Sequence, residues 1–209
     1  MQADIDVLND ALRDLHQAIA SDPIVTDKAW FSLIGFSTTP EVLLPLSDLS
    51  QVATMPGLSA KGSTDFGAVF RLLKQTIEAD VARLKADGAT VYRPAVFFMS
   101  DGMPTDPDWQ RGLDELLDPN FKQRPNVIAF GFGDANANNL DAATTLKAIA
   151  TKEVWMVEEG MAPAAALREW AKSLTSSIVG SVTSSTDGTM NLVVPPAPAG
   201  VRVIPVDEV

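Results

Sequence analysis

Short apolar runs alternate with amphipathic helical patterns along most of this 209-residue chain. The clearest runs cover residues 30–36, 95–99, 127–132 and 154–157. A run that is apolar on both faces is typical of a strand buried between two layers of helices. The alternation therefore predicts an α/β domain, with a doubly wound, mostly parallel sheet and helices on both of its faces.

The helices between these strands are predicted from apolar residues spaced three and four positions apart. In the first helix, which begins almost at residue 1, these residues are Ile5, Leu8, Leu12, Leu15 and Ile19. Further helices are expected from Phe66 to Leu84, from Asp108 to Leu117, from Leu140 to Ile149, and around residues 167–178. A shorter strand is expected at residues 41–46.

The composition changes after Gly180, where Ser, Thr and Gly give way to a Pro-rich stretch at residues 195–198. We therefore expect one domain over residues 1–180, followed by a linker and C-terminal tail over residues 181–209. Within this tail, residues 201–206 have the character of a strand.

The composition excludes several classes of function. The chain has no cysteine, so disulfides, thiol catalysis and Cys-based zinc sites are absent. A net charge of −11 disfavours nucleic acid and anionic membranes as partners, because both would repel the chain. The acidic N-terminal stretch does not resemble a secretory signal, and no run approaches the roughly 20 apolar residues that span a bilayer. We expect a cytoplasmic protein.

Two segments carry oxygen side chains to positions where a parallel sheet binds ligands, the carboxyl ends of its strands. They are Ser63-Thr64-Asp65, which precedes a helix, and Asp101, which follows a strand. Hydroxyl and carboxylate oxygens are the ligands that Mg²⁺ prefers. In the simpler interpretation, Ser63 or Thr64 caps the helix and Asp101 stabilises the turn at Gly102.

Other motifs give weaker signals. His16 is the only histidine and is expected at the surface, where it supports no catalytic triad. The sequence Gly131-Phe132-Gly133 is part of a dinucleotide-binding fingerprint but lacks its third glycine. The four tryptophans are expected in the core.

Several segments together resemble the von Willebrand factor A domain, and most closely an intracellular bacterial branch found near tellurite-resistance genes. The segments, in chain order, are WFSLIGFS, GSTDFG, PAVFFMSDGMPTD and NVIAFGFGD. SDGMPTD is the most specific of them. The resemblance covers about residues 1–180, and the Pro-rich tail is also similar to that branch.

The resemblance implies a metal-ion-dependent adhesion site and no catalytic activity. It places two ligands of Mg²⁺ (or Mn²⁺) on Thr64 and Asp101, and the partner protein completes the coordination with an acidic side chain. It also implies a binding or scaffolding role in a protein complex, with a kinase or phosphatase of the same operon as candidate partners.

One part of the family pattern is missing. The family's first strand ends in an Asp-x-Ser-x-Ser loop just before the first helix, whereas this sequence starts at Met1, where that loop would have ended. The resemblance therefore predicts that the sheet lacks its central strand, between residues 30–36 and 95–100. We expect an upstream segment to fill this gap, rather than a neighbouring chain or a folded-back segment at residues 201–206.

Two other functions remain open at this stage. A metal-dependent hydrolase would use Asp101 and Asp106 around the ion. A structural domain of the same family would have lost the metal site. The coding sequence upstream of Met1 discriminates best among the three, because an Asp-x-Ser-x-Ser loop there favours the binding module.

Overall fold

The computed structural model describes residues 2–59, 63–158, 161–184, 192–194 and 196–206. Met1, Gly62 and Pro195, which entered the predictions above, lie outside the described residues. The helices are α1 (Gln2–Ala20), α2 (Pro23–Lys28), the 3₁₀ helix η1 (Leu49–Gln51), α3 (Phe66–Ala86), α4 (Trp109–Leu117), α5 (Leu140–Ile149) and α6 (Pro163–Thr183). The strands are β1 (Trp30–Gly35), β2 (Glu41–Asp48), β3 (Ala95–Ser100), β4 (Asn126–Gly131), β5 (Glu153–Val157) and β6 (Val201–Pro205).

The chain divides into two compact units. The first unit contains Met1–Gly35, Val42–Ala60 and Val157–Arg202. The second unit contains Phe36–Glu41, Lys61–Met156 and Val203–Val209. The candidate site residues Thr64 and Asp101 both belong to the second unit.

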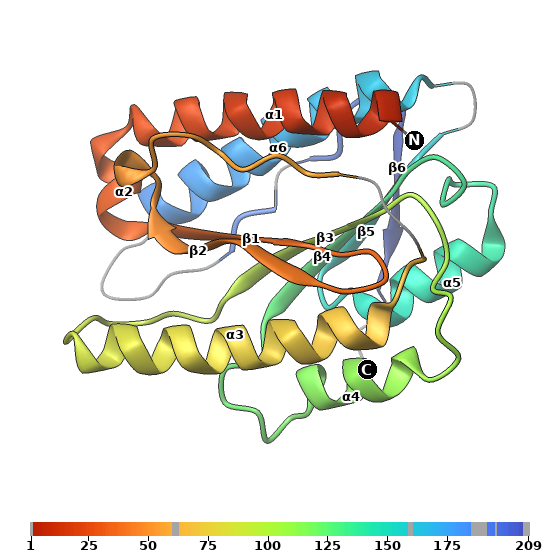
Figure 1. Ribbon diagram of the computed structural model, residues 1–209. Coiled ribbons are helices and arrows are strands. Elements are labelled where there is room, and N and C mark those ends of the chain that lie inside the picture. Colours follow the sequence, from red (N-terminus) through yellow and green to blue (C-terminus); the bar gives the residue numbers. More distant parts are fainter. Residues whose placement is uncertain (1, 60–62, 159–160, 185–191, 195, 207–209) are drawn as a thin grey trace. The chain divides into compact units, whose positions relative to one another are not determined.

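The strands form two sheets. One has four strands in the order β3-β4-β5-β6, and the other pairs β1 with β2. β3 runs parallel to β4, with Phe98 opposite Ala129, and β4 runs parallel to β5. The protein is thus an α/β protein with a mostly parallel four-stranded sheet and accompanying helices (Figure 1).

Two of the four strands predicted to be buried are not. All side chains of β4 except Asn126 are buried, and so are all those of β5 except Glu153. In β1, by contrast, no side chain is fully buried, and in β3 only Phe98 and Ser100 are. The physical reason is that β1 and β3 are edge strands, each with one described neighbour, and they do not pair with each other. Trp30, at the start of β1, is 44% exposed, so its predicted core position is wrong.

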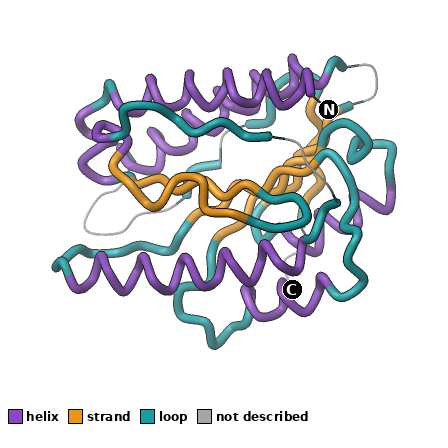
Figure 2. Tube along the Cα trace, in the orientation of Figure 1, coloured by secondary structure: helices purple, strands orange, loops and turns teal. Residues whose placement is uncertain are grey.

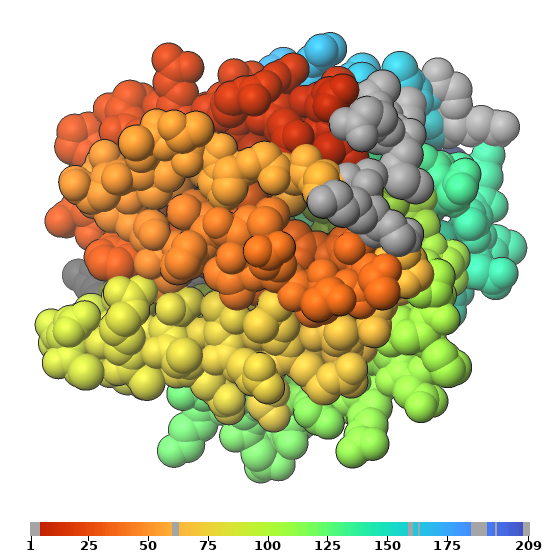
Figure 3. Space-filling view, in the orientation of Figure 1, coloured from red at the N-terminus to blue at the C-terminus, as the bar shows by residue number. Residues whose placement is uncertain are grey.

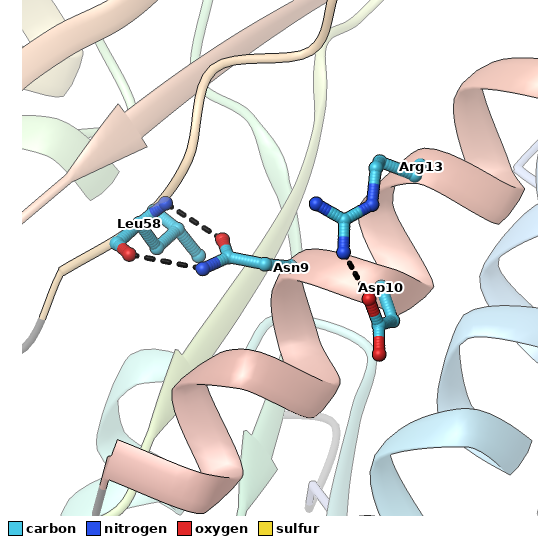
Figure 4. Close-up of polar contacts among 4 residues, drawn as sticks. All are labelled: Asn9, Asp10, Arg13 and Leu58. Carbon is cyan, nitrogen blue, oxygen red and sulfur yellow. Dashed lines mark hydrogen bonds and ion pairs between the residues drawn. The ribbon is translucent and has the colours of Figure 1, made fainter.

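In the first unit, α1 packs against α6 and α2 (Figure 1). Four of the five predicted core residues of α1 are buried, the exception being Ile5. The loop that precedes residue 60 lies along α1 (Figure 3). There the side-chain amide of Asn9 accepts a hydrogen bond from the Leu58 amide at 2.7 Å and donates one to the Leu58 carbonyl at 3.0 Å (Figure 4). On the same helix, Arg13 forms an exposed ion pair with Asp10.

Buried serines of α6 hold a later segment of the same unit. The hydroxyl of Ser177 donates to the Val193 carbonyl at 2.5 Å, and the Ser181 hydroxyl accepts from the Val193 amide at 2.8 Å. Part of the predicted linker is therefore docked on a helix. Farther along, β6 adjoins β5, in agreement with the strand character of residues 201–206. The folded-back segment thus pairs at the β5 edge of the sheet and not between β1 and β3.

An aromatic cluster forms the core of the second unit near the start of α3. The ring of Phe66 packs edge-on against those of Phe98 and Trp109, with centroids 5.0 and 6.2 Å apart. Phe70 joins the cluster, 5.5 Å from Phe98. These contacts bring α3 onto β3 and α4 onto α3, and the two helices lie side by side (Figures 1 and 2).

Among the described residues, no helix is both long enough and apolar enough to cross a membrane.

Candidate functional site

The last residue of β3 and the residues that follow it, 100–106, form the centre of the candidate site. This segment begins at Ser100, which is 4% exposed. The Ser100 hydroxyl donates to the Gly102 carbonyl at 2.8 Å and accepts from the Gly102 amide at 3.3 Å. These local bonds close the turn in which Asp101 lies, half-buried, just past the end of the strand.

Asp101 contacts the loop that follows β4. Its carbonyl accepts hydrogen bonds from the amides of Asp134 and Ala135, at 3.1 and 3.3 Å. Gly133 has a φ of +61°, a conformation that favours glycine, and a Cβ there would lie 3.4 Å from the Cβ of Asp101. The loop at residues 132–135 therefore lies directly against Asp101.

Thr64 lies against the other end of the same segment. Its carbonyl accepts from the Thr105 amide at 2.9 Å and from the Thr105 hydroxyl at 3.1 Å. Its own amide donates to the Thr105 hydroxyl at 3.2 Å. On the other side, the Ser63 amide donates to the Thr38 hydroxyl at 3.0 Å, and the Asp65 amide donates to the Ser37 carbonyl at 3.1 Å.

Two carboxylates satisfy the first amides of α3. Asp65, the N-cap, accepts from the Ala68 amide at 2.7 Å. Asp106 accepts from the Phe66 amide with one oxygen and from the Gly67 amide with the other, both at 2.9 Å. Negative charge is favourable at a helix N-terminus, where these amides have no partner within the helix.

Thr64 and Asp101 are thus brought into the same site region, although no hydrogen bond joins them directly. Asp101 belongs to residues 100–106, and Thr64 is hydrogen-bonded to Thr105 of the same segment. The Gly133 loop meets this segment at Asp101. The simpler interpretation of this region is wrong in the residues it names, because Asp65 rather than Ser63 or Thr64 provides the N-cap side chain, and the Ser100 hydroxyl rather than Asp101 bonds to Gly102. Within the described part of the chain, no three His, Cys, Asp or Glu side chains gather as a metal-binding group.

Sequence reasoning missed the residues that connect these loops, namely Thr38 and Thr105, and gave Asp106 a different role. Asp106 stands within SDGMPTD and was considered as a hydrolase carboxylate. Its hydrogen-bond partners, however, lie 39 and 40 positions away in the chain. No local pattern identifies such a pairing, because side-chain periodicity reports only which face of an element is buried.

An open cavity of about 440 Å³ lies beside the starts of α3 and α4. It is lined by Asp65, Arg71, Asp106, Pro107, Asp108, Arg111 and Glu115. One of its two guanidinium groups, that of Arg111, lies 3.7 Å from the carboxylate of Glu115. Because carboxylates outnumber guanidinium groups in the lining, the cavity does not favour an anionic ligand.

The remaining motifs have structural explanations. A Cβ on Gly131 would lie 2.3 Å from the Ala135 carbonyl oxygen and 2.6 Å from the Cδ1 of Leu146, so this glycine allows the loop after β4, and α5, to pack closely on the strand. His16 was expected at the surface but is half-buried, with its Nε2 3.0 Å from the Leu49 carbonyl oxygen. This contact joins α1 to η1 and gives the histidine a packing role in the first unit.

Comparison with known proteins identifies no relative. No protein-family model matches the chain, and no curated protein or solved structure matches it either.

Proposed function

We propose that this protein is a metal-ion-dependent binding or scaffolding module with a doubly wound fold of the von Willebrand factor A type. In this proposal Mg²⁺ (or Mn²⁺) binds through the Thr64 hydroxyl and the Asp101 carboxylate. A partner protein supplies a further carboxylate, so that the ion bridges the two proteins in the cytoplasm. A kinase or phosphatase of the same operon is the proposed partner.

The observation that carries this proposal is that the Thr64 loop and the Gly133 loop both meet residues 100–106, which include the Asp101 turn. The Thr64 loop, the Asp101 turn and the Gly133 loop belong to one unit and are joined by backbone hydrogen bonds. A hard cation requires oxygen ligands from separate loops at defined positions, and this arrangement provides a hydroxyl and a carboxylate. With only two protein ligands, the 209-residue chain is expected to bind metal weakly.

The hydrolase alternative is less well supported. It requires Asp106 as a second metal ligand or as an acid or base, but both oxygens of Asp106 already accept backbone hydrogen bonds. Asp106 thus has a structural role at the start of α3. A two-carboxylate mechanism is disfavoured for that reason.

Mn²⁺ is the probe that tests the proposal, because its paramagnetism broadens nearby amide resonances even when binding is weak. In the 209-residue chain, we expect Mn²⁺ to broaden the amides of Thr64 and Asp101 selectively. Mg²⁺ should compete and restore the signals. Asp101→Ala should abolish the selective broadening, since it removes the only carboxylate of the site.

The matched pair Thr64→Ser and Thr64→Val provides the control. Serine keeps the hydroxyl and should retain binding, whereas the isosteric valine should weaken it about tenfold or more, because a hard ligand is lost. A version extended by the residues encoded upstream of Met1 should bind Mg²⁺ more tightly, by calorimetry, if it carries the Asp-x-Ser-x-Ser loop. Equal affinity in the extended wild type and its Asp101→Ala variant would refute the proposal.

A further inference from the structure

We infer that Thr105 and Asp106 are positioning residues, which hold the Thr64 loop onto the segment that carries Asp101. The expected effect on metal affinity rests on the proposed function. Its structural part, the position of residues 64–67, can be tested without any metal.

Asp106 makes the most specific contact. Its two carboxylate oxygens accept separate hydrogen bonds from consecutive amides, those of Phe66 and Gly67, at 2.9 Å each. Hydrogen bonds to a charged acceptor are about twice as strong as those between neutral groups. The carboxylate thus fixes the first turn of α3, and the residues just before it, relative to residue 106.

The absence of a side chain at residue 67 makes this contact possible. A Cβ on Gly67 would lie 2.8 Å from one carboxylate oxygen of Asp106 and 3.2 Å from the Cα of Trp109. Gly112 of α4 packs against the same residue, since its Cβ would lie 2.6 Å from the Gly67 carbonyl oxygen. Asp106 therefore reaches the amides from within a close contact between α3 and α4.

Thr105 holds the residue that carries the proposed metal ligand. Its amide and hydroxyl make three hydrogen bonds with the backbone of Thr64, at 2.9, 3.1 and 3.2 Å. Because these bonds use the Thr64 backbone, they leave its hydroxyl available to a ligand. Residues 105 and 106 together thus bond to the backbone of three residues, Thr64, Phe66 and Gly67. The Asp65 amide between them donates to the Ser37 carbonyl.

The same segment fixes Asp101 at its other end. Its turn is closed by Ser100, and its carbonyl holds the Asp134 and Ala135 amides. A change at residue 106 should therefore release the Thr64 loop and leave the Asp101 turn in place. This selectivity distinguishes a positioning residue from one that merely stabilises the protein as a whole.

The test uses the 209-residue chain with Asp106→Ala, and Asp108→Asn as its matched control. Asp108 lines the same cavity and is exposed, but its side chain makes no cap hydrogen bond to α4. Asp106→Ala should raise the hydrogen-exchange rates of the Phe66 and Gly67 amides at least tenfold and leave those of Asp134 and Ala135 unchanged. Asp108→Asn should leave all four within about twofold of wild type, because it removes a charge and no hydrogen bond.

The metal readout uses Mn²⁺ as the probe. In Asp106→Ala, broadening at Asp101 should persist while broadening at Thr64 falls, and Mn²⁺ affinity should drop about tenfold. Thr105→Val should give a smaller loss of the same kind, and Thr105→Ser should restore wild-type behaviour, because it keeps the hydroxyl.

The outcomes separate the two proposals. If wild type shows no selective broadening at Asp101, the metal proposal fails, and the exchange rates still decide whether Asp106 positions the loop. If Asp106→Ala leaves the exchange of residues 66 and 67 unchanged, or if wild type and variant bind Mn²⁺ equally, the positioning inference is overturned and the metal proposal stands.

Discussion

Side-chain oxygens fix the backbone of a distant segment in both units, but they do so in different ways. In the second unit, Asp106 is half-buried and Thr105 is exposed. In the first unit, Ser177 and Ser181 are 0% and 7% exposed and bind both backbone groups of Val193. A buried neutral hydroxyl costs less desolvation than a buried charge, whereas a carboxylate at a helix start gains from the helix dipole.

The difference bears on where a binding site can form. The buried serines dock Val193 onto α6 and use both of their hydroxyls in doing so. Thr105 and Asp106 also join two segments, but they do so at the start of α3 and within the segment that carries the half-buried Asp101. The proposed metal site depends on the contacts in the second unit, whereas the serine contacts of the first unit dock one segment onto a helix.

The largest effect is predicted for a substitution that disrupts the close contact between α3 and α4 in the second unit. In Gly112→Ala, the new methyl group would meet the backbone of Gly67, which cannot rotate away. We expect a loss of about 3 kcal/mol in the free energy of unfolding, typical of overpacking against a rigid neighbour. Urea denaturation measures it. Gly102→Ala is the comparison, since a Cβ there meets nothing within 4 Å, and a similar loss in both variants would contradict the contact.

Asp106→Ala should have the next largest effect on stability. It leaves the Phe66 and Gly67 amides, both partly buried, without their acceptors. The expected loss is about 2 kcal/mol, the cost of unsatisfied donors at a helix start. Thermal and urea unfolding measure it beside Asp108→Asn, which should change stability by less than about 0.5 kcal/mol. Equal stability of both variants would show that the charge near the helices matters and the hydrogen bonds do not.

In the first unit, Ser181→Ala should destabilise more than Ser177→Ala. Ser181 accepts from the Val193 amide, which would lose this acceptor, whereas Ser177 donates to the Val193 carbonyl. A lone buried donor is costlier than an under-used carbonyl, so we expect about 1.5 and 1 kcal/mol respectively. Chemical unfolding of the two variants and of the double variant gives the order. The reverse order would show that the hydrogen bond from Ser177 to the Val193 carbonyl contributes more to stability than the bond that Ser181 accepts.

Asn9→Ala is expected to have the smallest effect, about 1 kcal/mol. It removes two hydrogen bonds to the backbone of Leu58, but both are only partly buried, so water replaces much of what is lost (Figure 4). The hydrogen-exchange rate of the Leu58 amide should rise by more than the loss in the free energy of unfolding alone would cause. Arg13→Ala, on the exposed face of the same helix, is the control and should change stability very little.

Much of the secondary structure was predictable from the spacing of apolar residues. The helix predicted from Leu140 to Ile149 has the bounds that the structure gives it, because Asn139 caps it and its apolar face is buried. The six-residue helix α2 was missed, although Asp22 and Pro23 form a recognisable start, because it is too short to show a periodic pattern. The burial of β1 and β3 was predicted wrongly, since an apolar run does not reveal whether a strand lies at the edge of a sheet.

The candidate site was predictable only in part. Thr64 and Asp101 follow from the positions of strand ends in a parallel sheet, which depend on the order of elements. The partners of Asp106 do not follow, because a polar contact between segments about 40 residues apart has no signature in either segment alone. The role of Thr105 was missed for the same reason.

The position of β6 has a consequence for how the protein is made. β6 adjoins β5, yet α6 and the segment bound by its serines are synthesised between the two strands. While a ribosome translates these residues, β5 emerges with one side of its backbone unpaired, and an unpaired edge is prone to associate with other chains. A nascent chain stopped before Val201 should therefore bind chaperones more strongly than one that includes Pro205, and the completion of the sheet should be a late, slow event.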